Sequence, residues 1–106
     1  MHALSHVTGG GLAANLARVL PVGVGADLDR STWSPAPVFD LVAAAGGIAR
    51  GELERTLNMG VGMVAVLAPD DADAAVQLLH EGGLQAWVCG VVTGGDPGVR
   101  LRGGHP

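Results

Sequence analysis

The strongest constraint on the fold is a change of hydrophobic period in the second half of the chain. Residues 63–68, MVAVLA, form a continuous apolar run that is too short for a typical helix, which predicts a strand buried on both faces. Pro69 ends this run, and the apolar residues after it recur with a helical period, which predicts a helix over 72–81. Its buried side is expected to carry Ala72, Ala75, Val76 and Leu79, and Gly82 and Gly83 are expected to end it.

Shorter patterns predict the remaining elements. Residues 85–93 alternate as a strand, GGDPG at 94–98 reads as a turn, and 99–101 are expected to return as a hairpin, so the second half has the order β-α-β-β. In the first half, helices are predicted over 12–20, 38–45 and 52–57, and a strand with one buried face over 22–28. The predicted fold class is α/β (α+β), a mixed sheet with packed helices, and the tail GGHP is expected to be frayed.

Composition narrows the classes of protein that fit. The 106 residues suit one domain or part of one, and 48% hydrophobic against 15% charged residues is too apolar for a disordered chain. A net charge of −4 and arginines that form no run argue against a nucleic-acid surface, and no apolar run approaches the roughly 20 residues of a membrane span. The first residues do not resemble a signal peptide, and a single cysteine, Cys89, cannot form an internal disulfide, so a cytoplasmic location is expected.

Three consecutive glycines, Gly9, Gly10 and Gly11, run directly into the helix predicted over 12–20. The N-terminus of a helix offers unpaired N–H groups and a partial positive charge, and glycines before it let the backbone close around an anion. The hydroxyl of Thr8 is a further ligand for such an anion, or a cap for the helix. On spacing alone, a simple turn that needs positive φ is the favoured explanation of the triplet, and neither the Walker motif nor the dinucleotide fingerprint is present.

Three other residues are candidates for contacts with a substrate. His6 is either a general acid or base, or a side chain bonded to the loop that it precedes. Asn58 either binds a carbonyl or amide of a substrate or caps the preceding helix, and Gly60 just after it allows tight packing before the strand. Trp33, in the stretch DRSTWSPAP, either stacks on a base or anchors the packing of its loop.

Taken together, the stretches SHVTGGGLAANLARVLP, DLDRSTWSPAPVF and RTLNMGVGMV resemble the C-terminal part of phosphoribosylformylglycinamidine cyclo-ligase, also called aminoimidazole ribonucleotide synthetase. The resemblance runs from residue 2 to about residue 101, and the combination is specific although each piece alone is weak. Two departures lie within the motifs. Ala13 and Ala14 stand where the family commonly has proline and an acidic residue, and Leu57 where it commonly has phenylalanine.

The resemblance implies a reaction. The full enzyme uses ATP and Mg²⁺ to activate the formyl amide oxygen of formylglycinamidine ribonucleotide, and the amidine nitrogen then closes the imidazole ring. It implies that the loop at Thr8, Gly9, Gly10 and Gly11 binds a phosphate of the substrate or of ATP, with His6, Asn58 and Gly60 as further substrate contacts. The resemblance leaves the catalytic residues unknown, and it implies no metal ligand in this chain and a homodimer for the full-length enzyme.

Length is the larger departure, because family members are roughly three times longer. Residues 1–106 are therefore expected to be a C-terminal fragment of the synthetase C-terminal domain, without the N-terminal ATP-binding domain and inactive alone. Two other interpretations stay open. One is another ATP-dependent member of the same superfamily, similar to selenophosphate synthetase or thiamine-monophosphate kinase. The other is a non-catalytic α/β binding module.

Overall fold

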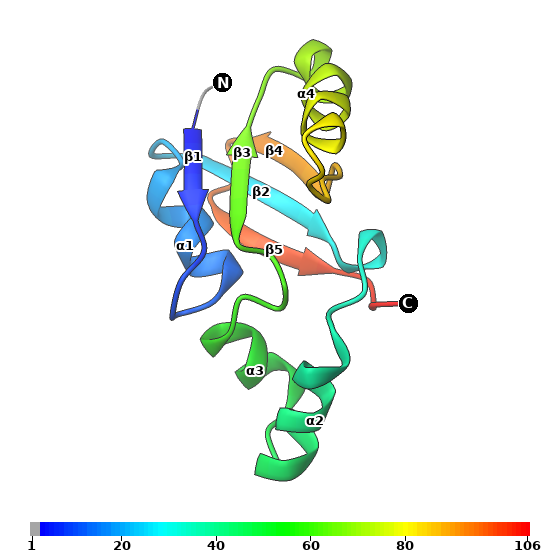
Figure 1. Cartoon of the computed structure of the whole chain (residues 1–106). Coiled ribbons are helices and arrows are strands. Elements are labelled where there is room, and N and C mark those ends of the chain that lie inside the picture. The colour runs from blue at the N-terminus through cyan, green and yellow to red at the C-terminus, as the bar shows by residue number, and fades with distance from the viewer. Residues whose placement is uncertain (1–2) are drawn as a thin grey trace.

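A computed structural model describes residues 3–106 of the chain, and Figure 1 shows its course. The strands are β1 (Ala3–His6), β2 (Val24–Asp29), β3 (Met63–Val66), β4 (Gly90–Gly94) and β5 (Gly98–Arg102). The helices are α1 (Leu12–Val19), α2 (Pro37–Gly46), α3 (Arg50–Thr56) and α4 (Pro69–Glu81), with a 3-10 turn at Arg30–Thr32. Each predicted helix and strand is present, with shifted ends.

The strands form two sheets. β1 and β3 pair antiparallel, while β2 lies at the centre of a second sheet, antiparallel to β4 and parallel to β5. The predicted mixed α/β class is therefore confirmed. The predicted hairpin of β4 and β5 is wrong, because β2 lies between these two strands.

Gly25 on β2 explains how the chain passes from β4 to the far side of β2. A Cβ atom at Gly25 would lie 2.1 Å from the carbonyl oxygen of Asp96 and 2.4 Å from that of Gly98. The connection between β4 and β5 thus crosses directly over the backbone of β2, which only a residue without a side chain permits. The sequence pattern predicts the turn at this point but not the crossing.

A single arginine then ties the three strands together. Arg100 on β5 donates from Nε to Oδ1 of Asp27 on β2 at 2.5 Å, and from a terminal nitrogen to Oγ1 of Thr93 on β4 at 3.0 Å. The hydrogen bond from Arg100 lowers the pKa of Asp27 below its ordinary value. This ion pair therefore stabilises the strand order β4-β2-β5 at neutral pH.

The core lies between the two sheets and α1 (Figure 1). β1, β3 and the segments that flank them contribute Val7, Val61 and Val64, and the second sheet contributes Ala26 and Leu28. Leu12 and Leu16 come from α1, and Trp33 is 8% exposed within this cluster. The indole Nε1 of Trp33 donates to the carbonyl oxygen of Met59 at 3.1 Å, so Trp33 is a packing anchor of its loop.

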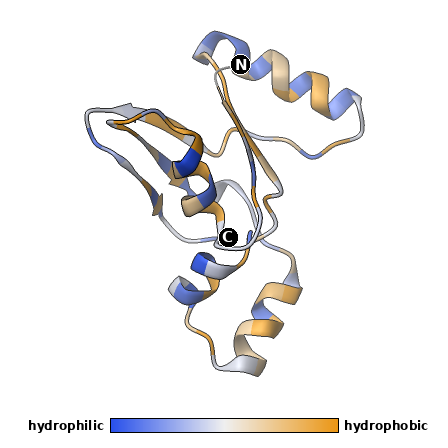
Figure 2. Cartoon of the chain, turned by 90° about the vertical axis from the view of Figure 1, so that its left-hand side faces the viewer, coloured by the Kyte–Doolittle hydropathy of each residue, from blue (hydrophilic) through white to orange (hydrophobic). Residues whose placement is uncertain are grey.

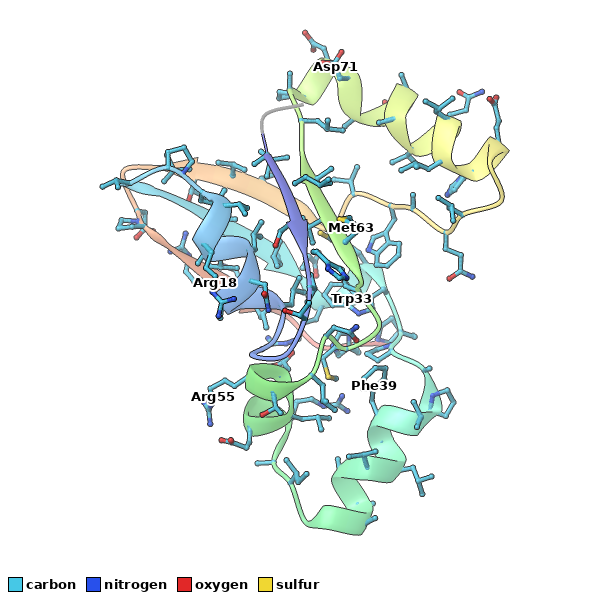
Figure 3. The ribbon with its side chains drawn as sticks, turned by 60° about the vertical axis from the view of Figure 1, so that its left-hand side comes forward. Arg18, Trp33, Phe39, Arg55, Met63 and Asp71 are labelled. Carbon is cyan, nitrogen blue, oxygen red and sulfur yellow. The ribbon has the colours of Figure 1, made fainter. Side chains whose placement is uncertain are left out.

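The burial predicted for both faces of β3 is not observed. Val64 is buried, but Met63 is 55% exposed, and Figure 3 shows Met63 at the start of the strand. Burial on both faces is therefore wrong: β1 and β3 form a two-stranded sheet that turns one face to the core and leaves the other open.

The apolar stripes of α2 and α4 are also exposed. Neither helix has a buried residue, and the exposed fraction is 68% at Leu41 and 42% at Leu79. The predicted buried side of α4 is therefore wrong, although Ala72, Ala75 and Val76 are half-buried. Figure 2 shows both helices standing away from the sheets at opposite ends of the molecule, with apolar residues along each. A helical period predicts an apolar face but not which segment covers it.

Several element ends differ from the prediction for local reasons. β2 starts at Val24, two residues late, because Val24 N–H bonds to Pro21 O in a turn where Gly23 has φ 82°. β4 starts at Gly90 and not at 85, because its partner β2 ends at Asp29. The helix ends at Gly47 and Gly82 are confirmed. Within residues 3–106, no helix combines the length and apolar character that crossing a membrane requires.

Candidate anion-binding loop

The glycine triplet forms a tight loop between β1 and α1 whose conformation only glycine adopts readily. Gly10 has φ 98° and Gly11 has φ 87°. Gly11 is buried against α3: a Cβ atom there would lie 2.1 Å from the carbonyl oxygen of Glu54. The loop backbone is also held to α3 by the N–H of Gly10, which donates to Thr56 O at 3.3 Å. The predicted need for positive φ is confirmed at two of the three glycines.

The N-terminus of α1 carries no side-chain cap. Gly11 occupies the cap position, and the first turn contains no acidic residue. The hydroxyl of Thr8 donates to Oδ1 of Asn15 at 3.3 Å, so Thr8 is not the helix cap. The positive end of the helix dipole, about half a unit charge, is therefore not offset by a carboxylate in that turn.

A shallow cavity of about 360 Å³ lies beside this helix start. Gly10, Ala13 and Ala14 line one side, and Arg30, Glu54 and Arg55 line the other. Figure 3 shows Arg18 on α1 and Arg55 on α3 projecting toward the same side of the molecule. Ala13 and Ala14 thus line this cavity with small side chains.

Asn15 organises the loop, which the sequence analysis missed. The Nδ2 group of this buried residue donates to Gly11 O at 2.6 Å and Thr8 O at 3.2 Å, with Gly9 O at 3.5 Å. Its spacing of three residues after Leu12 and one before Leu16 puts it on the buried face of α1, a signal that was available in the sequence.

A buried ion pair supports the far side of the cavity. Arg30 donates from Nε and a terminal nitrogen to both carboxylate oxygens of Glu54, at 2.8 Å each, and the Glu54 side chain is 7% exposed. The bidentate bond to Glu54 raises the pKa of Arg30. Arg30 also donates to Leu101 O at 2.7 Å and to Gly103 O at 3.0 Å, so it joins α3 to the end of β5.

The expectation of a frayed tail is wrong at His105. Its ring packs edge-on against Trp33 with centroids 4.9 Å apart, and its side chain is 9% exposed. Nδ1 lies 2.9 Å from Arg30 O and 3.0 Å from Trp33 O. Because both partners are carbonyl oxygens, Nδ1 is the donor in these contacts. Nothing local in the tail predicts this contact, because its partners lie more than 70 residues away along the chain.

The other predicted contacts lie apart from the cavity beside α1. Asn58 holds a turn: its Oδ1 accepts from the N–H of Gly60 at 2.9 Å, and Met59 between them has φ 54°. Gly60 lines a second hollow, of about 580 Å³, with Trp33 and Trp87. His6 is exposed at the end of β1, opposite Met63. The structure therefore does not bring Gly10 and Gly60 to one cavity, and the substrate roles of His6, Asn58 and Gly60 stay predictions.

A metal site is not formed by the side chains that the structure describes. Among residues 3–106, no three side chains of His, Cys, Asp or Glu come together in a way that could hold an ion. Two carboxylates of α3 form ion pairs with arginines, in the pairs Arg30–Glu54 and Arg55–Glu52. The side chains of residues 3–106 therefore do not fit a Mg²⁺ site.

Comparison with known proteins gives a consistent result. Residues 1–102 match the family described as AIR synthase related protein, C-terminal domain. The chain is 62% identical over 93 residues to a protein of Streptomyces fradiae named "Putative phosphoribosylformylglycinamidine cyclo-ligase", covering 88% of this chain and 51% of that protein. It is 46% identical over 98 residues to the phosphoribosylformylglycinamidine cyclo-ligase of Anaeromyxobacter dehalogenans, covering 92% of this chain and 28% of that protein.

A relative from Symbiobacterium thermophilum with the same cyclo-ligase name is 43% identical over 98 residues, again over 92% of this chain and 28% of the relative. The chain thus spans about half the length of one of these relatives and just over a quarter of the other two.

Proposed function

We propose a function from one premise: the chain belongs to the family of AIR synthase related proteins, whose C-terminal domain it matches over residues 1–102. The proposed whole protein is a phosphoribosylformylglycinamidine cyclo-ligase, which forms aminoimidazole ribonucleotide in purine biosynthesis. The names of the relatives support this function over a selenophosphate synthetase, a thiamine-monophosphate kinase or a non-catalytic module. Residues 1–106 are its C-terminal part, and an N-terminal ATP-binding domain completes the enzyme.

In the proposed reaction, the formyl amide oxygen of formylglycinamidine ribonucleotide receives the γ-phosphoryl group of ATP. The amidine nitrogen then bonds to that carbon, and the oxygen leaves with the phosphoryl group as phosphate. Such chemistry depends on positioning and on charge stabilisation more than on a protein nucleophile. The contribution of this chain is to hold a phosphate group of the substrate or of ATP at Thr8, Gly9, Gly10 and Gly11.

The observation that carries this role is the glycine loop. Two residues with positive φ lead into a helix whose first turn has neither a side-chain cap nor an acidic residue, beside an open cavity. This arrangement is typical of backbone phosphate sites. The contacts for Mg²⁺ belong to the N-terminal domain in this proposal. The whole enzyme is a homodimer in this proposal. We also propose a cytoplasmic location, in keeping with Cys89 being a free cysteine.

Titration of the ¹⁵N-labelled 106-residue chain with inorganic phosphate tests the loop. We expect the amide signals of Gly9 and Leu12 to shift progressively at millimolar phosphate, because an anion at the helix start polarises these N–H groups. Amides of α4, at the other end of the molecule, serve as the internal control (Figure 1). Loop signals that stay fixed while amides elsewhere move would show that the phosphate site lies outside the loop.

A further inference from the structure

The two-stranded sheet of β1 and β3 is covered on one face only. Alternate residues of each strand point to its other face, and these are all exposed: Leu4 and His6 on β1, Met63 and Ala65 on β3. The exposed fraction is 48% at Leu4 and 55% at Met63. We call this surface the open face. A two-stranded sheet is marginally stable by itself, so an open face of this kind gains stability from a further packed layer.

The helix α4 enlarges the apolar surface on this side of the molecule. Only Leu67 and Ala68 separate the end of β3 from the start of α4. Figure 2 shows the helix extending to the side of β1 and β3 that faces away from the second sheet. None of its residues is buried, and Leu78 is 69% exposed. The open face thus borders a helix whose apolar residues are not buried either.

The accessible surface of the chain shows how much area is left uncovered. It is 6419 Å², whereas a folded monomer of 10.6 kDa exposes about 5,500 Å². The excess is about 900 Å², and each partner in a standard protein interface contributes about 800 Å². The radius of gyration, 14.0 Å, likewise exceeds the value of about 13 Å that is typical of this length. The uncovered area is therefore large enough for one side of a stable dimer interface.

The charge of the open face indicates what kind of partner fits it. Residues 3–6 and 63–66 contain no Asp, Glu, Lys or Arg, so a partner recognised by charge finds no counter-charge there. An isologous contact brings the same patch of two subunits together, so the patch has to be self-complementary, and homodimer interfaces are accordingly more apolar than others. Residues 63–66 also lack the proline or charged residue that commonly protects a strand from pairing with another chain.

We propose that a second copy of this chain covers the open face, in an isologous dimer in which the open faces of the two copies pack against each other. Met63 of each copy is then buried in the contact. The area that is left uncovered and the lack of formal charge on the face both favour this partner. The dimer is independent of the phosphate role of the glycine loop and of the reaction proposed for the whole protein.

Sedimentation velocity of the 106-residue chain over a range of concentrations tests the dimer, with Met63→Glu compared with Val22→Glu. Both variants replace an exposed apolar side chain by the same charge, but Val22 lies in the turn between α1 and β2. Two-fold symmetry places two carboxylates of Met63→Glu in one apolar contact. We expect the dimer Kd to rise at least about tenfold in Met63→Glu and less than about twofold in Val22→Glu. Met63→Leu, which keeps the face apolar, is expected to stay within about twofold of the wild type.

Amide signals of the ¹⁵N-labelled chain locate the contact. On dilution from dimer to monomer, we expect the signals of residues 3–6 and 63–66 to shift, while those of β5 in the second sheet stay fixed. Thermal unfolding of Met63→Glu at concentrations where the wild type is monomeric is expected to match the wild type, because this side chain is exposed in the single chain. A match shows that the variant loses the dimer and not the fold.

Four results would overturn the proposal. The first is a chain that stays monomeric at millimolar concentration, and the second is a dimer that Met63→Glu weakens no more than Val22→Glu. The third is assembly beyond the dimer, which indicates a head-to-tail contact. The fourth is a monomeric chain whose residues 63–66 become protected from hydrogen exchange only when it is joined to the N-terminal portion of a relative. In that case the rest of the whole protein covers the open face. No phosphate enters these measurements, so their failure leaves the phosphate loop untouched.

Discussion

Replacing Gly11 with alanine is expected to destabilise the fold by about 3 kcal/mol or more, because two penalties add at this position. The residue has φ 87°, a conformation that L side chains rarely adopt. Its added Cβ would also meet the backbone oxygen of Glu54 at 2.1 Å. The loop and α3 would have to separate, and the cavity beside α1 would change with them.

The three glycines of the loop supply their own controls. At Gly10 the φ of 98° remains unfavourable but the nearest atom is 3.8 Å away, so Gly10→Ala is expected to cost only about 1 kcal/mol. At Gly9 nothing lies within 4 Å and φ is outside the positive range, so Gly9→Ala is expected to be near neutral. Urea denaturation measures the series. Equal losses at the three positions would contradict the close packing of Gly11 on α3.

Replacing Glu54 with alanine is expected to cost about 3 kcal/mol, because it leaves a partly buried guanidinium without its counter-charge. Arg30 is 23% exposed, which keeps the cost at the lower end of the range for buried pairs. The loss extends beyond one pair, since the same guanidinium holds the carbonyl oxygens of Leu101 and Gly103. Chemical denaturation with a calorimetric check of the unfolding temperature measures it.

Glu52→Ala is the matched control for Glu54→Ala. Glu52 also pairs with an arginine, at 2.6 Å to Arg55, but these side chains are 60% and 73% exposed. An exposed pair one turn apart on a helix contributes about 0.5 kcal/mol or less. Similar losses in the two variants would mean that burial of the Arg30–Glu54 pair adds nothing to the stability of the fold.

The conformation of the glycine loop could be predicted from the sequence because it depends on neighbouring residues. Glycines in consecutive positions before an apolar helical period predict both the positive φ at Gly10 and Gly11 and the start of α1 at Leu12. The order of strands and helices follows from periods in the same way. These features depend on neighbours a few residues away, which the sequence places together.

Contacts between residues far apart in the sequence could not be predicted from local patterns. The contact of Gly11 with Glu54, the pair of Arg30 with Glu54 and the packing of His105 on Trp33 join residues that no local pattern relates. The crossing at Gly25 has the same cause, since a turn at residues 95–97 fits a hairpin equally well. Asn15 is different: its helical position relative to Leu12 and Leu16 predicts burial, although its side chain is polar.

We propose that this chain supplies a phosphate-binding part of a cyclo-ligase and needs an ATP-binding domain for turnover. The direct test is an assay with ATP, Mg²⁺ and formylglycinamidine ribonucleotide on the 106-residue chain and on the same chain joined to the N-terminal portion of a relative. We predict aminoimidazole ribonucleotide from the joined protein alone, with ATP consumed in equal amount. Product from the 106-residue chain by itself, or none from a folded joined protein that binds ATP, would contradict the account.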